Sequence, residues 1–343
     1  MVPFVPSDLV EYPIISYFKF RNKGKLIDQE LSHSFISTYG RFYRKDPRNF
    51  FIKDFKSSLH DIKWGKSISR GPFLHSIAKF RSPYHPLSPI LKETKYHPVL
   101  NMITHQYRYK DSDEKEDKKS AVLHLHGYAE NTFFFHELSY FRLFRHFFNC
   151  NIFTLELPYH FHRQPIDSPF SGAYYLNGNP IRMLEAIRQS IQEILYMIQY
   201  LKEKYERIIL FGVSLGGHLA ALTTQFFTDV DIICALASPF LFNLNPKIVP
   251  VSTKFVSKIK ENGHIDWYKI LYVCNLKYFS PFTTNRHTAI IGGVYDRIVP
   301  FSRVNNLATL LHKPLFVYPG GHLSLIIWLR PLLHRINNFF VKK

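Results

Sequence analysis

The clearest pattern in the chain is an alternation of short apolar runs and longer amphipathic segments between residues 99 and 340. Short runs rich in β-branched and aromatic residues predict buried strands, whereas apolar residues three and four positions apart predict helices with one apolar face. Strands that alternate with helices form a mainly parallel sheet covered on both faces, so we expect an α/β fold. The predicted strands are 99–109, 121–125, 151–157, 207–211, 232–237, 287–292 and 315–318, and the predicted helices are 133–148, 181–204, 215–227, 302–312 and 323–340.

Two regions depart from this alternation. Residues 238–286 contain four prolines and show weak periodicity, so we predict an insertion that acts as a lid above the carboxyl ends of the strands. Residues 1–95 are basic and aromatic and carry proline-rich pieces, and no regular element is evident there. We expect them to be an N-terminal extension that packs on a core domain formed by residues 96–343.

Composition is that of a globular protein. The chain has 343 residues, of which 46% are hydrophobic and 20% charged, enough to bury a large core and too apolar for disorder. Three scattered cysteines, Cys150, Cys234 and Cys274, exclude a disulfide scaffold and a cysteine-rich zinc site, and they favour a reducing compartment. Because neither an apolar run of transmembrane length nor a targeting segment is evident, we predict a cytoplasmic protein without a transmembrane segment.

The charge balance is strongly basic. Lys and Arg number 44 against 26 Asp and Glu, which gives a formal net charge of +18. Such a surface attracts nucleic acid, phospholipid headgroups or acidic substrates. A basic nucleic-acid binder is one open alternative, although no motif that reads nucleic acid accompanies the charge. We therefore do not expect nucleic acid as a partner, and we expect a peripheral contact with an anionic membrane surface.

The segment Gly212-Val-Ser-Leu-Gly216 lies between a predicted strand and a predicted helix. A serine on such a sharp turn is exposed at the sheet edge, and glycines two positions to either side let the neighbouring backbone pass closely. The following helix offers free backbone N–H groups beside the serine. This context predicts that Ser214 is a nucleophile, whereas small residues at a tight packing turn are the alternative.

A nucleophilic serine requires a base, and the base requires an acid that orients it. Asp296 follows the predicted strand 287–292, and His322 follows the next strand, 315–318. Both therefore belong on the same sheet edge as Ser214, in the chain order serine, acid, histidine. The alternatives are a turn-forming aspartate and a core histidine.

The loop after the strand 121–125 reads His126-Gly-Tyr-Ala129. Acyl transfer requires two N–H donors for the developing oxyanion, one from the residue after the nucleophile and one from this loop. We predict the backbone N–H groups of Leu215 and Tyr128, with Ala129 as the alternative to Tyr128. Gly127 and His126 are expected to support the loop rather than to take part in the chemistry.

Histidine pairs at alternate positions, at 124 and 126 and at 160 and 162, resemble half of a metal site. Neither pair has a further His, Asp or Glu at a recognisable spacing. We therefore expect no metal and no cofactor.

With these motifs in place, the chain from about residue 99 to 340 resembles the α/β-hydrolase superfamily. The resemblance rests on HGYAE, ELPYHFHR, GVSLGG, GVYDRIVP and PGGH. It implies the α/β-hydrolase fold and a Ser214–His322–Asp296 triad that cleaves a small-molecule or lipid acyl ester, or a thioester, through an acyl-enzyme. The segments 157–160 and 170–172 look closest to the group around α/β-hydrolase domain-containing protein 18. Phe161 departs from this group, which often has Gly there, and so does Ala173, where an acidic residue is common.

Two further classes of function stay open beside the serine hydrolase. Because a fold does not dictate an activity, the chain can be a non-catalytic binding protein with the same architecture. It can also be the basic binder of nucleic acid or of membrane surfaces that its charge favours.

Overall fold

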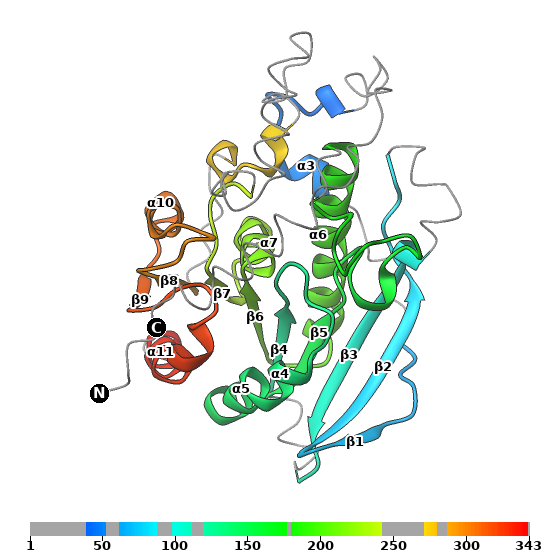
Figure 1. Ribbon diagram of the computed structural model, residues 1–343, viewed down its shortest axis with the longest axis vertical. Coiled ribbons are helices and arrows are strands. Elements are labelled where there is room, and N and C mark those ends of the chain that lie inside the picture. Colours follow the sequence, from blue (N-terminus) through cyan, green and yellow to red (C-terminus); the bar gives the residue numbers. More distant parts are fainter. Residues whose placement is uncertain are drawn as a thin grey trace.

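The computed structural model describes residues 39–52, 62–87, 98–111, 119–176, 180–241, 271–279 and 287–341. Within these residues, nine strands form one sheet in the order β1-β2-β3-β5-β4-β6-β7-β8-β9 (Figure 1). Strands β4 to β9 are parallel to one another. Strands β1, β2 and β3 extend one side of the sheet, and each of them is antiparallel to its neighbours. The predicted mainly parallel α/β sheet is confirmed.

The strands are β1 (Ile68–Arg70), β2 (Phe73–Arg81), β3 (Asn101–Tyr109), β4 (Ser120–Leu125), β5 (Asn151–Leu155), β6 (Arg207–Val213), β7 (Asp231–Ala235), β8 (Thr288–Gly293) and β9 (Leu315–Tyr318). The α-helices are α3 (Arg48–Phe51), α4 (Phe134–Leu138), α5 (Tyr140–Phe148), α6 (Pro180–Lys202), α7 (Leu215–Thr223), α10 (Phe301–Leu311) and α11 (Leu325–Val341). Short 3-10 turns are η4 (Phe161–Arg163), η5 (Tyr272–Cys274) and η6 (Leu276–Tyr278).

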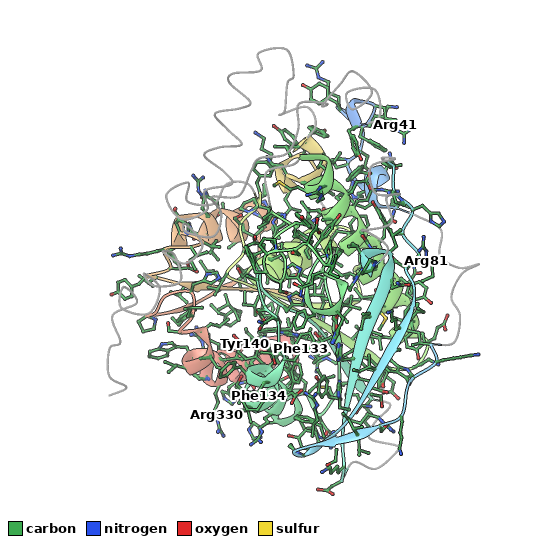
Figure 2. The ribbon with its side chains drawn as sticks, turned by 45° about the vertical axis from the view of Figure 1, so that its right-hand side comes forward. Arg41, Arg81, Phe133, Phe134, Tyr140 and Arg330 are labelled. Carbon is green, nitrogen blue, oxygen red and sulfur yellow. The ribbon has the colours of Figure 1, made fainter. Side chains whose placement is uncertain are left out.

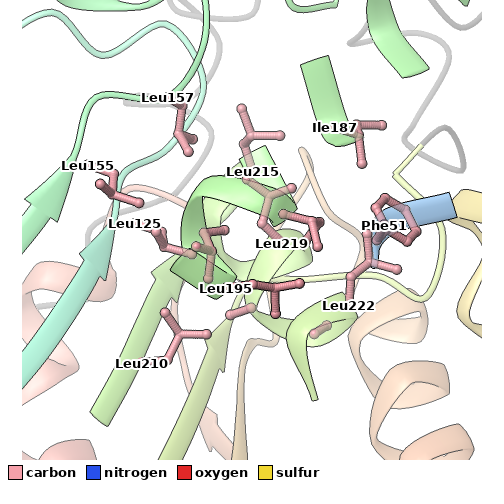
Figure 3. Packing of buried hydrophobic residues seen from close by; sticks show 14 of the residues in the cluster. Phe51, Leu125, Leu155, Leu157, Ile187, Leu195, Leu210, Leu215, Leu219 and Leu222 are labelled. Carbon is pink, nitrogen blue, oxygen red and sulfur yellow. The ribbon is translucent and has the colours of Figure 1, made fainter. Parts of the chain in front are cut away.

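Helices cover both faces of the sheet. Figure 1 shows α6, α7 and α10 above the parallel strands and α5 and α11 below them. Every residue of β4, β7 and β8 is buried, which is why these strands read as continuous apolar runs in the sequence. Figure 3 shows Leu215, Leu219 and Leu222 of α7 packed with Ile187 of α6 and with Leu210 of β6. This packing fixes the helix that begins directly after Ser214.

The single helix predicted over residues 133–148 is wrong, because the structure contains α4 and α5 instead. The break lies at Ser139, whose backbone leaves the helical region with φ −123° and ψ −79°. Its hydroxyl donates a hydrogen bond to the Phe135 carbonyl oxygen at 2.5 Å. Serine side chains compete in this way for backbone groups, and the apolar spacing across the break hides the change of direction.

The N-terminal region contributes to the same sheet. The hairpin β1–β2 turns at Gly71, whose φ is 55°, and β2 pairs along its whole length with β3. Tyr39, Phe50 and Phe51 are buried in the core on the α6 face. Of the predicted lid, residues 242–270 and 280–286 lie outside the described residues. None of the helices in the described ranges combines the length and apolar character that crossing a membrane requires.

Candidate active site

Backbone strain gathers at the carboxyl edge of the parallel strands. Ala129 follows β4, Tyr159 and Phe161 follow β5, Ser214 follows β6 and Leu236 follows β7, and all five have φ between 50° and 66°. Residues with side chains adopt positive φ at a cost, and such strain concentrates at functional sites. The strain therefore marks this edge as the candidate site.

Ser214 lies on the predicted sharp turn between β6 and α7, with φ 56° and ψ −112°. Its N–H donates to the Ala235 carbonyl oxygen at 2.9 Å, which ties the turn to β7. A Cβ on Gly212 would lie 2.1 Å from the Gly216 oxygen, and a Cβ on Gly216 would lie 2.2 Å from the Leu125 oxygen. Only glycine fits at these two positions, so the G-x-S-x-G spacing is a packing requirement of the turn.

Asp296 and His322, predicted from separate loops, contact each other. The Nδ1 of His322 and the Oδ2 of Asp296 are 2.7 Å apart, and both side chains are nearly buried. The Oδ1 of Asp296 accepts the backbone N–H groups of Ile298 and Val299, each at 2.8 Å. These bonds fix the carboxylate, which in turn orients the imidazole ring.

Two further bonds fix the loops that carry this pair, one within the loop of His322 and one between the two loops. The Tyr318 hydroxyl donates to the Gly321 carbonyl oxygen at 2.7 Å. The Tyr295 N–H, from the loop that carries Asp296, donates to the Gly320 carbonyl oxygen at 3.0 Å. Because β8 and β9 are parallel neighbours, both loops leave the same sheet edge as Ser214.

The loop after β4 lies against the turn that carries Ser214. The Gly216 N–H donates to the His126 carbonyl oxygen at 3.1 Å. A Cβ placed on Gly127 would lie 3.7 Å from the Cβ of Ser214. The structure therefore brings together the loop and the serine that sequence reasoning assigned to one site.

The predicted N–H donors occupy two different settings. Leu215 is the first residue of α7, where a backbone N–H has no partner within the helix. Tyr128 follows Gly127 directly, and the next residue, Ala129, turns the chain with φ 64°. Both donors thus come from the two segments that meet at Ser214.

His126 uses both ring nitrogens for structural bonds. Its Nδ1 donates to the Gly127 carbonyl oxygen at 2.7 Å, and its Nε2 accepts the Leu157 N–H at 3.0 Å. Burial lowers the pKa of His126 to about 4, so the ring stays neutral near pH 7. The side chain therefore links the loops after β4 and β5 and has no nitrogen left for proton transfer.

Glu130 is a site residue that sequence reasoning missed. Its Oε1 accepts the Gly127 N–H at 2.7 Å, and its Oε2 pairs with the His136 imidazole. Burial alone would raise the pKa of the Glu130 carboxyl, but the neighbouring imidazoles, chiefly that of His136, hold this pKa below its usual value. Glu130 is the last residue of the HGYAE motif, so the motif already pointed to this loop. No spacing rule, however, predicts that its carboxylate binds the Gly127 N–H.

The segments 157–160 and 170–172 are joined in space. Gly172 has φ 83°, and a Cβ there would lie 2.2 Å from the Nε2 of His160. Its N–H donates to the Tyr159 carbonyl oxygen at 2.8 Å, and the Phe161 N–H donates to the Ser171 hydroxyl at 3.0 Å. The Ser171 hydroxyl donates in turn to the Glu130 backbone oxygen. The two segments therefore support the loop beside Ser214.

Phe161, one of the two departures from the resemblance, has φ 50°. Glycine adopts that conformation without strain, which explains why glycine suits this position.

Among the described residues, no group of three or more His, Cys, Asp or Glu side chains is arranged to hold a metal ion. Cys150, Cys234 and Cys274 are free and buried.

Comparison by sequence finds no matching protein-family model and no matching curated protein. Comparison by structure finds similar solved proteins. Acetyl xylan esterase 1 from Thermoanaerobacterium sp. JW/SL YS485 aligns with a TM-score of 0.59 at 13% identity, over 90% of this chain and 99% of that chain. The acetyl xylan esterase from Paenibacillus sp. R4 aligns with a TM-score of 0.61 at 12% identity, over 94% and 98%. The Pyrococcus furiosus esterase Pf2001 aligns with a TM-score of 0.51 at 11% identity, over 83% and 98%. Together with the sheet topology, these similarities establish the α/β-hydrolase fold.

Proposed function

We propose that this chain is a serine hydrolase that cleaves carboxylic ester or thioester bonds, with Ser214, His322 and Asp296 as its catalytic triad. One observation carries the proposal: Asp296 holds His322 at 2.7 Å on the same sheet edge as the strained Ser214 turn. Esterases among the similar structures support this class of reaction. The subgroup around α/β-hydrolase domain-containing protein 18 is part of the proposal and rests on the segments 157–160 and 170–172.

The reaction takes place in two halves. In the first, the Nε2 of His322 accepts the Ser214 hydroxyl proton while the serine oxygen attacks the acyl carbon. The carbon–oxygen bond to the alcohol, or the carbon–sulfur bond to a thiol, then breaks, and His322 gives the proton to the leaving group. In the second, His322 accepts a proton from a water molecule that attacks the acyl carbon. The bond between this carbon and the serine oxygen then breaks, which releases the carboxylic acid, and His322 gives the proton to Ser214. Asp296 keeps the ring in the tautomer that both halves require.

The oxyanion of each tetrahedral intermediate is stabilised by the backbone N–H groups of Leu215 and Tyr128. Each donor of this kind is worth about 3 kcal/mol of barrier. The bond from Gly127 to Glu130 and the bond from Gly216 to His126 support this assignment, because they hold the two donor segments against each other.

The substrate we propose is a small-molecule or lipid acyl ester that carries an anionic group or lies at an anionic membrane surface. The net charge of +18 supports this assignment, because such a field concentrates anions near the protein. The acetyl xylan esterases act, by their names, on acetyl esters of xylan. At 12–13% identity that substrate does not transfer to this chain.

Labelling with a fluorophosphonate probe tests the proposal. This probe reacts covalently with an activated serine, so we expect stoichiometric labelling of the native chain and none of Ser214→Ala. Ser302→Ala, which removes an exposed hydroxyl at the start of α10, is the matched control and should label as the native chain does. A folded native chain that takes up no label would exclude the serine hydrolase and favour the non-catalytic binding protein.

A further inference from the structure

We propose that α4 and the first turns of α5 and α11 form a surface that docks on an anionic lipid bilayer beside the candidate site. We call this surface the docking face; it comprises Phe134, Phe135, Leu138, Arg142, Leu323, Ile326, Ile327 and Arg330. The inference deepens the proposed function and rests on it in one respect only, namely that a lipid ester is the substrate.

Exposed apolar side chains concentrate on these elements. Phe134 and Phe135 on α4 are 54% and 66% exposed, and Ile327 on α11 is 50% exposed. Leu138, Leu323 and Ile326 are exposed as well. Exposed apolar side chains gathered on neighbouring elements are typical of an interaction site in soluble proteins.

The register of the two helices brings these side chains together. Helix α5 follows β4 and α11 follows β9, and both cross the same face of the parallel sheet, so both begin near its carboxyl edge. The Phe147 and His334 rings are 6.1 Å apart, which aligns the last turn of α5 with the third turn of α11. Helix α4 therefore lies level with the start of α11. Figure 2 shows Phe134, Tyr140 and Arg330 on the lower side of the molecule.

The charge of the docking face is cationic. Arg142 and Arg330 are exposed on α5 and α11. Glu137, the acidic residue of these three helices, is buried and pairs with Arg70 at 3.0 Å. Aromatic and aliphatic side chains that project among arginines match a bilayer interface, where rings enter the headgroup layer and arginines contact lipid phosphates.

The docking face adjoins the candidate site. Leu323 follows His322 directly, and the exposed Tyr295 precedes Asp296. Helix α4 is tied to the loop beside Ser214 through the pair formed by His136 and Glu130. A bilayer in contact with the docking face would therefore lie beside the loops that carry His322 and Glu130.

Charge decides between a bilayer and a second copy of the chain. In a symmetric dimer the same patch would face itself, which would bring Arg142 and Arg330 of both copies together. Two chains with a net charge of +18 repel each other, whereas an anionic bilayer attracts the same arginines.

Vesicle co-sedimentation tests the docking face. We expect the native chain to bind vesicles of phosphatidylcholine with phosphatidylglycerol and to bind neutral phosphatidylcholine vesicles weakly. The double variant Phe134→Ser with Phe135→Ser should lose roughly tenfold or more in partitioning, and Arg330→Ala about fivefold. The matched controls are Ile68→Ser with Ile77→Ser, which are exposed on β1 and β2, and Arg81→Ala at the end of β2. These controls should bind as the native chain does.

Two results of the vesicle assay would overturn the docking face: vesicle binding that the control substitutions weaken as much as the test substitutions do, or equal binding to neutral and anionic vesicles. A native dimer that Phe134→Ser with Phe135→Ser dissociates, measured by light scattering, would overturn it in favour of self-association. Hydrolysis of a soluble short-chain ester should stay within about twofold in every surface variant, because none of them touches the triad. Ser214→Ala should still bind vesicles, so loss of labelling and loss of docking are separate failures.

Discussion

The two halves of the sheet each hold an imidazole bonded to a buried carboxylate, but the two pairs have different surroundings. In the parallel half, His322 contacts Asp296 at 2.7 Å on the edge where Ser214 lies. In the half that includes the antiparallel strands, the Nε2 of His105 contacts the Oε1 of Glu156 at 2.9 Å. Glu156 also lies at this edge, because it directly follows the parallel strand β5. The difference is in the ring: the second nitrogen of His105 is bonded to His75, so no nitrogen remains for proton transfer, and the catalytic role that we propose for His322 does not extend to His105.

The second pair belongs to a longer chain of bonds. The Nε2 of His75 lies 3.0 Å from the Nδ1 of His105, and the exposed His162 bonds to Glu156 at 2.8 Å. We call His75, His105, Glu156 and His162 the histidine–glutamate chain. If His105 donates to Glu156, its Nδ1 must accept from His75, which fixes the tautomers of both rings. This chain joins β2, β3 and the loop after β5, so its role is structural.

The largest effect is expected from Asp296→Asn. The amide preserves the shape of the carboxyl but stabilises the wrong tautomer of His322, so kcat for ester hydrolysis should fall roughly 10⁴-fold. Melting by circular dichroism checks that the variant folds. A loss below about tenfold in a folded variant would place the orienting acid elsewhere and remove the distinction between the two pairs.

The next effect is expected from Glu130→Gln. An amide in place of the carboxylate weakens the bond to the Gly127 N–H and the pair with His136, so the donor loop loses its fixed position. We expect kcat to fall roughly 100-fold with KM within about threefold, because the interaction acts on the transition state. Two results would show that Glu130 only supports the fold. One is a change in KM with kcat unchanged, and the other is a loss of fluorophosphonate labelling that accompanies a loss of thermal stability.

Glu156→Gln is expected to affect stability instead of catalysis. The buried carboxylate accepts bonds from His105 and His162, and the amide NH₂ would face one of these donors. Unfolding by urea should show a loss of about 2 kcal/mol, while kcat stays within about threefold. Should kcat fall as far as in Asp296→Asn, the histidine–glutamate chain would belong to the catalytic machinery.

The smallest effect concerns acid stability. Burial lowers the pKa of His75 to about 3 and that of His126 to about 4, whereas an unfolded histidine has a pKa of about 6.5. Below pH 6.5 the unfolded state therefore binds more protons, and the free energy of unfolding falls by up to about 1.4 kcal/mol per pH unit for each such ring. His75→Gln, which keeps a donor to His105, should flatten this slope between pH 6.5 and 5. A slope identical to that of the native chain would contradict the assignment.

The parallel strands were predictable because their signal is local. A strand buried on both faces reads as an uninterrupted apolar run, and β4, β6, β8 and β9 lie within two residues of their predicted bounds. The hairpin β1–β2 was not predicted, since its half-exposed strands gain their stability from pairing with β3. The division between α4 and α5 was missed for the opposite reason: the apolar spacing continues across Ser139, and a side-chain bond ends the helix.

The sequence by itself determined which side chains follow which strands, and parallel pairing then requires Ser214, Asp296 and His322 to leave one edge. Only the tertiary structure decided that Asp296 and His322, 26 residues apart, are bonded, and that His105 meets Glu156 across 51 residues. The order of the strands, with β5 between β3 and β4, sets these neighbours. That order follows from burying all the apolar faces at once, a property of the whole chain that no single segment records.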